Sequence, residues 1–152
     1  MRFLGSVEAK ADAKGRFFFP ASFRKLLQSA SEERLILRKD VFQDCLTLYP
    51  ESVWNEQLTR LRKRLSRWSA SEQALFRQFI SDVEILTLDS NGRILIPKRY
   101  LKAAGINQDA RFIGMDDVIE LWSREALDKP FVEAGIFAQE IEKIMHDNEN
   151  EQ

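Results

Sequence analysis

Two short segments carry residue types suited to contacting an anion, and each places an arginine four positions after an aspartate. The segments are 12–16 (DAKGR) and 89–93 (DSNGR). A guanidinium steadied by a neighbouring carboxylate keeps further N–H donors free for a phosphate group or a guanine base. At the tips, Lys14 and Asn91 add a cation and an amide. The spacing therefore predicts two matched loops that contact nucleic acid.

The other residues of these segments are predicted to shape the loops. Each glycine closes a three-residue hairpin loop at a position of positive φ, where it has no Cβ to clash. Each aspartate is expected to pair with the arginine opposite it and to accept hydrogen bonds from loop N–H groups. That role needs no ligand, and we favour it for both aspartates. The predicted contact residues are Lys14, Arg16, Asn91 and Arg93, and the predicted orienting residues are Asp12, Gly15, Asp89 and Gly92.

The two segments belong to an internal duplication with a constant offset of 77 residues. Residues 12–20 correspond to 89–97, and both stretches end in a proline. The correspondence continues to Asp40 and Asp117, after which the first copy has a four-residue insertion. Two copies are too few for a solenoid. We therefore expect them to pack on each other.

Each copy is predicted to be a small β-α-β unit, so the expected fold class is α+β. Short alternating or apolar runs indicate strands, and Pro20 and Pro97 suit the first turn of a helix. Gly105 is expected to end the second helix. Strands are expected near 7–11, 17–19, 35–38 and 46–49, then near 83–88, 94–96, 112–114 and 119–122, with helices near 20–28 and 97–104.

A helical connector is predicted between the copies, over residues 53–80. An apolar seam from Trp54 to Trp68 has spacings of 4, 3, 4 and 3, as in a coiled coil. We interpret this seam as core or subunit interface. Ser69 and Glu72 are expected to form a capping box for a second helix.

The charged segments leave alternatives open. The basic run 60–67 is either a second nucleic-acid contact or a solvated helix face, and we favour the solvated face. Basic residues on the second-copy helix, over 98–102, either border the binding face or are simply solvated. The apolar residues between Phe131 and Ile144 are a possible contact with a neighbouring subunit. Residues 147–152 form a polar tail that we expect to be disordered.

The net charge of −1 conceals an uneven distribution. Residues 1–80 hold 15 Lys and Arg against 9 Asp and Glu, whereas residues 81–152 hold 8 against 15. Much of the negative charge lies in residues 125–152. A basic face and an acidic tail can therefore coexist in this chain, which permits nucleic acid as a partner.

Several other classes of protein fit the sequence poorly. No apolar stretch is long enough for a membrane helix, and an acid at Glu8 comes too soon for a signal peptide, so we expect a soluble cytoplasmic protein with no membrane partner. Cys45 is the single cysteine and is interpreted as an inert core thiol. His146 is the single histidine, and there is no phosphate-cradling or dinucleotide motif. We predict no enzyme activity, no cofactor, no metal site and no small-molecule substrate.

The paired segments, together with 3–5 (FLG), 20–24 (PASFR) and 120–123 (ELWS), resemble the MraZ family over nearly the whole chain. The resemblance implies two tandem AbrB-like (SpoVT-AbrB) domains of the swapped-hairpin type, which would pack about a pseudo-twofold axis. It also implies a homo-oligomeric ring in the cytoplasm, associated with the nucleoid. The implied partner is double-stranded DNA, at short repeats in the promoter of the cell-division and cell-wall gene cluster, which the family usually represses.

By the same resemblance, Asp12, Arg16, Asp89 and Arg93 are the family's paired D-x-x-x-R positions. The expected domains are 5–52 and 81–124 (AbrB-like), 53–80 (connector) and 125–152 (C-terminal helix and acidic tail). The rival hypothesis is a ring-forming scaffold, or an antitoxin-like protein partner, without specific DNA binding. Exposure of the two arginines would favour the DNA hypothesis.

Overall fold

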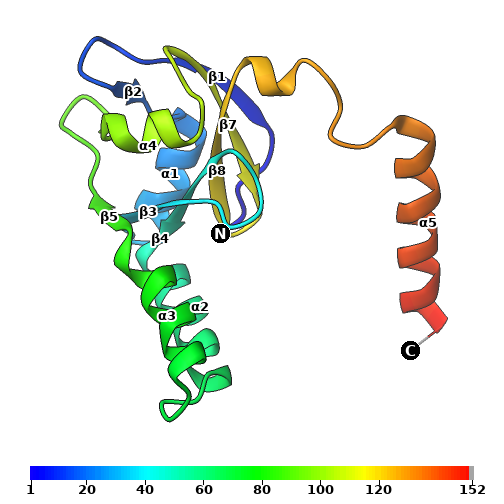
Figure 1. The fold of residues 1–152 in the computed structure, drawn as a ribbon. Coiled ribbons are helices and arrows are strands. Elements are labelled where there is room, and N and C mark those ends of the chain that lie inside the picture. The colour runs from blue at the N-terminus through cyan, green and yellow to red at the C-terminus, as the bar shows by residue number, and fades with distance from the viewer. Residues whose placement is uncertain (151–152) are drawn as a thin grey trace.

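A computed structural model describes residues 1–150, with side chains described as far as Asp147. Figure 1 shows a β-rich body, a helical hairpin projecting from it and a separate C-terminal helix. The strands are β1 (Ser6–Lys10), β2 (Arg16–Phe18), β3 (Leu35–Lys39), β4 (Leu46–Pro50), β5 (Val83–Leu86), β6 (Arg93–Leu95), β7 (Asp109–Met115) and β8 (Val118–Ser123). The helices are α1 (Ala21–Ser29), α2 (Glu51–Arg64), α3 (Ala70–Ser81), α4 (Lys98–Ala103), η1 (Glu125–Leu127) and α5 (Ala134–Asn150).

The two copies are interleaved within one sheet. Its order is β1-β7-β8-β4-β3-β5, and every neighbouring pair is antiparallel. The first strand of each copy pairs with the other copy, because β1 lies beside β7 and β5 lies beside β3. This exchange confirms the predicted α+β fold of two tandem repeats.

The exchange corrects one local expectation. We predict that the strands before and after each loop form a hairpin, and the loop itself does close, since Asp12 N donates to Arg16 O at 3.0 Å. Beyond that bond the strands separate, because β1 pairs with β7 while β2 pairs with β6. In β1 this pairing places opposite charges across from one another, since Glu8 lies opposite Arg111 and Lys10 lies opposite Asp109.

The pair β2 and β6 lies on the pseudo-twofold axis. Phe17 is opposite Ile94, and these two residues are equivalent in the duplication. Both side chains are fully buried. Because side chains alternate along a strand, Arg16 and Phe18 of β2 point to the opposite face, together with Arg93 and Leu95 of β6. We call this outward face of β2 and β6 the ribbon face.

One core serves both copies. Aromatic side chains from the first copy pack edge-on against Phe112 of the second, with ring centroids 6.2 Å away for Phe17 and 5.6 Å away for Phe19. Burying such side chains contributes roughly 1.5–3 kcal/mol each. The core therefore supports the ribbon face from its buried side, and both copies contribute residues to that core.

The helical hairpin α2–α3 is attached to β3 and β4 by aromatic packing. Trp54 stacks on Phe79, with centroids 5.3 Å apart, and meets Tyr49 edge-on at 5.1 Å. The predicted seam fails at its far end, because α2 stops at Arg64 and Trp68 lies in the following turn with 97% of its surface exposed. At the start of α3, Ser69 Oγ accepts from Glu72 N at 3.3 Å, but Glu72 Oε1 accepts from Ser66 N and not from Ser69 N, so half of the predicted capping box is formed.

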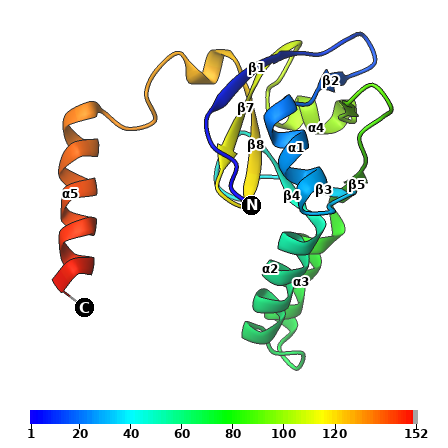
Figure 2. The ribbon, with the colours of Figure 1, turned by 180° about the vertical axis from the view of Figure 1, so that it is seen from behind.

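The C-terminal helix α5 lies apart from the body, as both Figure 1 and Figure 2 show. All its residues with described side chains are exposed. The predicted disordered tail is wrong for 147–150, where the helix continues, and the last two residues of that prediction lie outside the described residues. Among the described residues, no helix is long and apolar enough to cross a membrane.

Candidate nucleic-acid interface

The first loop is organised around the carboxylate of Asp12. Its Oδ1 accepts from the backbone N–H groups of Lys14, at 2.9 Å, and Arg16, at 3.0 Å. Its Oδ2 accepts from Arg16 Nε at 2.6 Å, which forms the predicted ion pair. The carboxylate thus fixes both the turn and the guanidinium.

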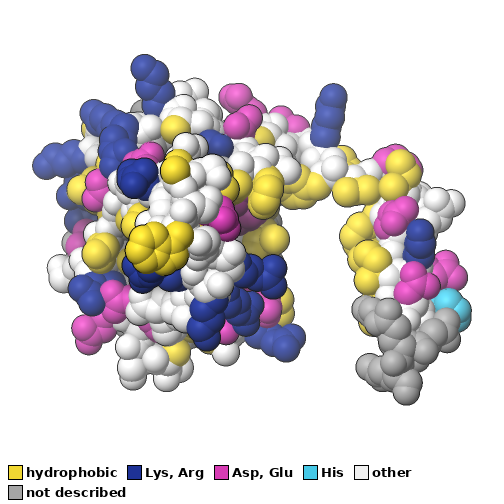
Figure 3. Space-filling view, turned by 60° about the horizontal axis from the view of Figure 1, so that its bottom comes forward, with side chains coloured by type: hydrophobic (Ala, Val, Ile, Leu, Met, Phe, Trp, Pro, Cys, Tyr) yellow, Lys and Arg dark blue, Asp and Glu magenta, His cyan; other side chains and the backbone are white. Residues whose placement is uncertain are grey.

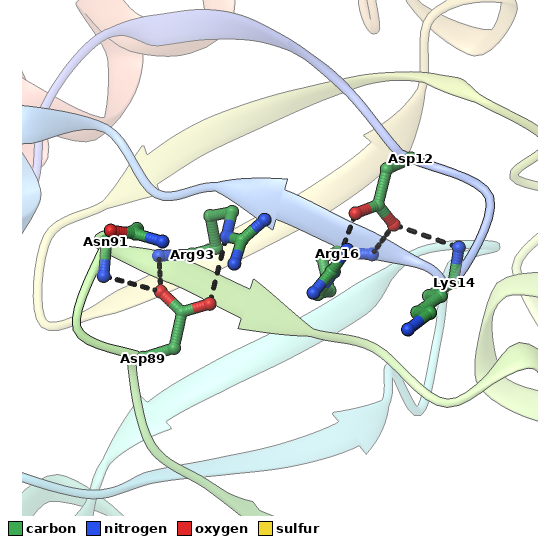
Figure 4. A network of polar contacts seen from close by, with 6 residues as sticks. All are labelled: Asp12, Lys14, Arg16, Asp89, Asn91 and Arg93. Carbon is green, nitrogen blue, oxygen red and sulfur yellow. Dashed lines mark hydrogen bonds and ion pairs between the residues drawn. The ribbon is translucent and has the colours of Figure 1, made fainter.

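The second loop repeats this arrangement. Asp89 Oδ1 accepts from the N–H groups of Asn91 and Arg93, each at 2.9 Å. Asp89 Oδ2 accepts from Arg93 Nε, also at 2.9 Å. Figure 4 shows the two loops flanking the β2–β6 pair from opposite sides, with Arg16 and Arg93 between them. The eight predicted site residues therefore form one assembly rather than two distant sites.

The two glycines let each loop pack closely against the other copy. Gly15 and Gly92 have φ of +88° and +78°, as predicted. The Gly15 carbonyl accepts from Ile96 N at 2.9 Å, and the Gly92 carbonyl accepts from Phe19 N at 3.0 Å. A Cβ at Gly15 would lie 2.8 Å from the carbonyl oxygen of Ile96. Only glycine fits this combination of backbone conformation and close approach.

Both arginines keep part of their surface in solvent. The exposed fraction of the side chain is 32% for Arg16 and 23% for Arg93. Each uses Nε for its aspartate, and among the described residues neither Nη atom of either arginine has a hydrogen-bond partner. These terminal N–H groups are available to a ligand in a fixed orientation.

Two apolar side chains complete the ribbon face. Phe18 lies directly opposite Arg93, and Leu95 lies opposite Arg16. Their exposed fractions are 67% and 51%. Residues 17–19 and 94–96 are predicted only as apolar strands. Because side chains alternate along a strand and Phe17 and Ile94 are buried, their neighbours Phe18 and Leu95 point outward.

Each loop rests on the helix of the other copy, and these contacts differ. Arg24 of α1 lies against Gly92, where its guanidinium occupies the space a Cβ would take. At the equivalent place, Leu101 of α4 lies 3.7 Å from the position of a Cβ on Gly15. The second loop, whose tip is the uncharged Asn91, therefore has an arginine beside it. Arg24 is not among the predicted contact residues, although the offset of 77 pairs it with Leu101.

The basic residues of the second-copy helix α4 lie in two different environments. Lys98 and Lys102 line a surface hollow of about 290 Å³ together with Asp12 and Gly15 of the first loop. Arg99 instead binds Asp82, with Nη1 to Oδ1 at 2.6 Å, and Glu84, with Nη2 to Oε1 at 3.0 Å. The two lysines border the candidate interface, whereas the arginine tethers α4 to the start of β5.

One grouping of metal-ligating types occurs among the described residues. Asp40, Cys45 and Glu120 place ligand atoms within 4.8 Å of one another. Both Asp40 oxygens already accept hydrogen bonds, and Glu120 accepts from Trp122 Nε1 at 2.9 Å. Burial raises the pKa of the Cys45 thiol, which opposes the thiolate that a metal requires. We interpret these residues as a structural cluster between the β3–β4 loop and Glu120 of β8.

We predict that Asp12 titrates in an unusually acidic range. The backbone N–H of Arg16 is the largest influence, and with the Arg16 side chain and the Lys14 N–H it lowers the pKa of Asp12 from 3.8 to about 2. A lowered pKa stabilises the folded state above the ordinary value, and this contribution is lost as the pH falls through about 2. Carboxyl chemical shifts in an NMR titration would measure the midpoint.

The variant Arg16→Ala provides the control for this titration. It removes the guanidinium but keeps the backbone N–H, so the midpoint of Asp12 should rise and still stay below 3.8. A wild-type midpoint at or above 3.8 would show that the carboxylate does not organise the loop.

Sequence comparisons identify relatives of this chain. Residues 2–78 and 79–143 each match the model of the family described as MraZ protein, antitoxin-like. A protein of Phocaeicola vulgatus named transcriptional regulator MraZ is 65% identical over 150 residues, covering 99% of this chain and 97% of the relative. Proteins with the same name from Bacteroides thetaiotaomicron and Flavobacterium psychrophilum are 62% and 32% identical, covering 100% and 93% of this chain and 97% and 90% of their own length.

The two matched segments follow the duplication, and each contains one Asp-x-x-x-Arg loop of the ribbon face. Since the family model covers both copies and the relatives align along nearly the full chain, this chain belongs to the MraZ family.

Proposed function

We propose that this protein is a transcriptional regulator that binds double-stranded DNA sequence-specifically through the ribbon face. The observation that carries the proposal is the placement of Arg16 and Arg93 on one exposed face, each held by an aspartate and related by the pseudo-twofold axis. The names of the relatives support the regulatory role. Because these relatives are named transcriptional regulators, we also propose that the chain is a regulator and not an enzyme.

The ribbon face suits the DNA major groove. That groove admits a two-stranded antiparallel ribbon, and an arginine there can bind guanine O6 and N7 with two hydrogen bonds. We assign that role to Arg16 and Arg93. Phe18 and Leu95 lie beside them and are suited to contact thymine methyl groups, the apolar feature of the same groove.

Neighbouring cations are suited to the phosphate backbone on either side. Lys14, Lys98 and Lys102 surround the first loop, while Arg24 lies beside the second. Asn91 at the second tip adds an amide donor. Phosphate contacts of this kind fix the orientation of a protein on DNA, and base contacts supply the specificity.

The remaining parts of the proposal follow from family membership. We propose that the chain acts in the cytoplasm at the nucleoid, as a homo-oligomeric ring, on short repeats in the promoter of the cell-division and cell-wall gene cluster. Several ribbon faces in register would multiply a weak single contact through effective concentration. We retain 5–52 and 81–124 as the DNA-binding repeats, joined by the connector 53–80 and followed by 125–152.

A salt series with two DNA duplexes tests the proposal. One duplex is the region upstream of the host's division cluster, and the other has the same composition in scrambled order. We expect at least about 1,000-fold tighter binding to the upstream duplex, and a steep loss of affinity with salt on both duplexes. Equal affinities would remove specific regulation, and no binding even at low salt would favour the scaffold or antitoxin-like hypothesis.

A further inference from the structure

The helix α5 presents an apolar face that its own chain leaves open. Ile136, Phe137, Ile141, Ile144 and Met145 are each between 46% and 59% exposed. The last four are spaced 4, 3 and 1 residues apart, which places them on one side of the helix. Figure 3 shows apolar side chains along one side of α5 and charged side chains on the other. Such a face requires a partner in water.

The hairpin α2–α3 offers a matching apolar groove. The groove has a volume of about 250 Å³, and Val41, Leu61, Leu65, Leu75 and Phe79 line it together with Arg38 and Gln78. Val41 and Leu75 are 56% and 64% exposed. In Figure 3 this end of the molecule shows apolar side chains with Lys and Arg around them. The groove is wide and apolar enough to receive side chains from a helix.

The two surfaces have opposite charge. Residues 53–80, which form most of the hairpin, hold six Lys and Arg and two Glu. Residues 133–152 hold six Asp and Glu and a single Lys. Complementary charge steers two surfaces together and fixes their register. It also gives the basic run of the hairpin a partner other than DNA.

The attachment of α5 favours the hairpin of another copy over its own. Phe131 packs on Trp122 with ring centroids 5.0 Å apart, which leaves only two residues before α5 begins at Ala134. Glu133 then caps the helix, accepting from Gly135 N at 2.8 Å and Ile136 N at 3.2 Å. The start of α5 is thus held near the Trp122 end of β8.

The hairpin is anchored at the other end of that strand. Val118, the first residue of β8, packs against the cluster that contains Trp54 of α2. A separation of four residues along a strand is about 13 Å. Figure 1 and Figure 2 accordingly show α5 and the hairpin apart, with no contact between them.

We propose that α5 of one copy docks its apolar face into the α2–α3 groove of a second copy. Two copies can dock reciprocally in a closed dimer, or the contact can repeat head-to-tail to build a closed ring or an open chain. The inference deepens the proposed self-assembly by naming its surfaces, and it does not depend on DNA binding. It also gives a reason for the exposure of both surfaces in a single chain.

Disulfide trapping in the full-length protein tests the docking. Ala138→Cys lies three residues from Ile141 and seven from Met145, on the border of the apolar face, and Gln78→Cys lines the groove. The native Cys45 is fully buried and does not compete. The two variants, each with one introduced cysteine, are mixed under mild oxidation and separated on a non-reducing gel. We expect a disulfide-linked dimer that contains one chain of each variant.

The matched control moves the cysteine to the opposite side of α5. Gln139→Cys mixed with Gln78→Cys should give at least tenfold less of the mixed dimer. Equal yields would overturn the docking. In the double variant Ala138→Cys/Gln78→Cys, a bond formed only within one chain would overturn the second copy as occupant. Ile141→Asp, against Ile141→Leu, should lower the mass measured by light scattering, and an unchanged mass would also contradict the proposal.

These results are distinguishable from failure of the DNA proposal, because trapping requires no DNA. If the chain forms the mixed dimer but does not discriminate between the duplexes, the docking is supported and the proposed regulatory role is contradicted.

Discussion

Changing both Arg16 and Arg93 to alanine is expected to weaken binding to the upstream duplex by at least about 30-fold while leaving the fold intact. A bidentate contact between arginine and guanine contributes about 1–3 kcal/mol, and the double variant removes two such contacts. The fold should persist because each aspartate still accepts hydrogen bonds from backbone N–H groups of its loop. Fluorescence anisotropy measures the affinity, and circular dichroism checks the fold.

A control with the same loss of charge separates position from charge. Arg2 and Lys129 are both exposed and lie outside the ribbon face. Arg2→Ala/Lys129→Ala should reduce affinity no more than about threefold, because the interaction of distant charges is screened at physiological salt. If both double variants lose affinity equally, the ribbon face has no special role. Arg16→Lys/Arg93→Lys should keep salt-dependent binding but lose discrimination between the duplexes, since lysine cannot form the paired contact.

Gly15→Ala is expected to lower the free energy of unfolding by about 2–5 kcal/mol. A non-glycine residue in the left-handed region costs roughly 1–2 kcal/mol. The new Cβ would also lie 2.8 Å from the carbonyl oxygen of Ile96, and relieving such overpacking costs about 1–3 kcal/mol. The strand that carries Arg93 would have to move. Urea denaturation at fixed protein concentration measures the loss, and DNA binding should fall with it.

Gly105→Ala isolates the contribution of the close contact. Gly105 has a similar φ of +67°, but a Cβ there would meet nothing within 4 Å. We expect a loss of about 1 kcal/mol at this position, from backbone conformation alone. Equal losses at Gly15 and Gly105 would mean that the loop does not press on the other copy.

Elements with strong local signals could be predicted from the sequence. The loops have glycine at their last position and an aspartate at their first, and both glycines do adopt positive φ. The helix starts at Pro20 and Pro97 lie within one residue of their expected places. The Asp–Arg ion pairs follow from spacing alone, because four residues in a tight loop leave the two side chains adjacent. Local chemistry determined these features.

Strand pairing depends on residues far apart in the chain, and no local pattern specifies it. The exchange pairs β1 with β7 and β5 with β3, and each of these pairs joins segments that are far apart in the chain. The outward direction of Phe18 and Leu95 follows from that pairing. The prediction for Trp68 is wrong because its spacing fits a helical seam although the helix ends before it. The position of Arg24 beside the second loop likewise requires α1 of one copy to lie under the other.

The two halves of the interleaved sheet belong to one chain, so their sequences can differ and the twofold symmetry is only approximate. A dimer of identical chains must present identical half-sites, so its preferred operators are palindromes. Here the halves have already diverged, with Lys14 and Leu101 at one loop and Asn91 and Arg24 at the other. Under the proposed function, one molecule can read a box whose two ends differ, and so can recognise a direction along the DNA. An array of boxes all pointing the same way is the kind of operator that such a polar reader would select.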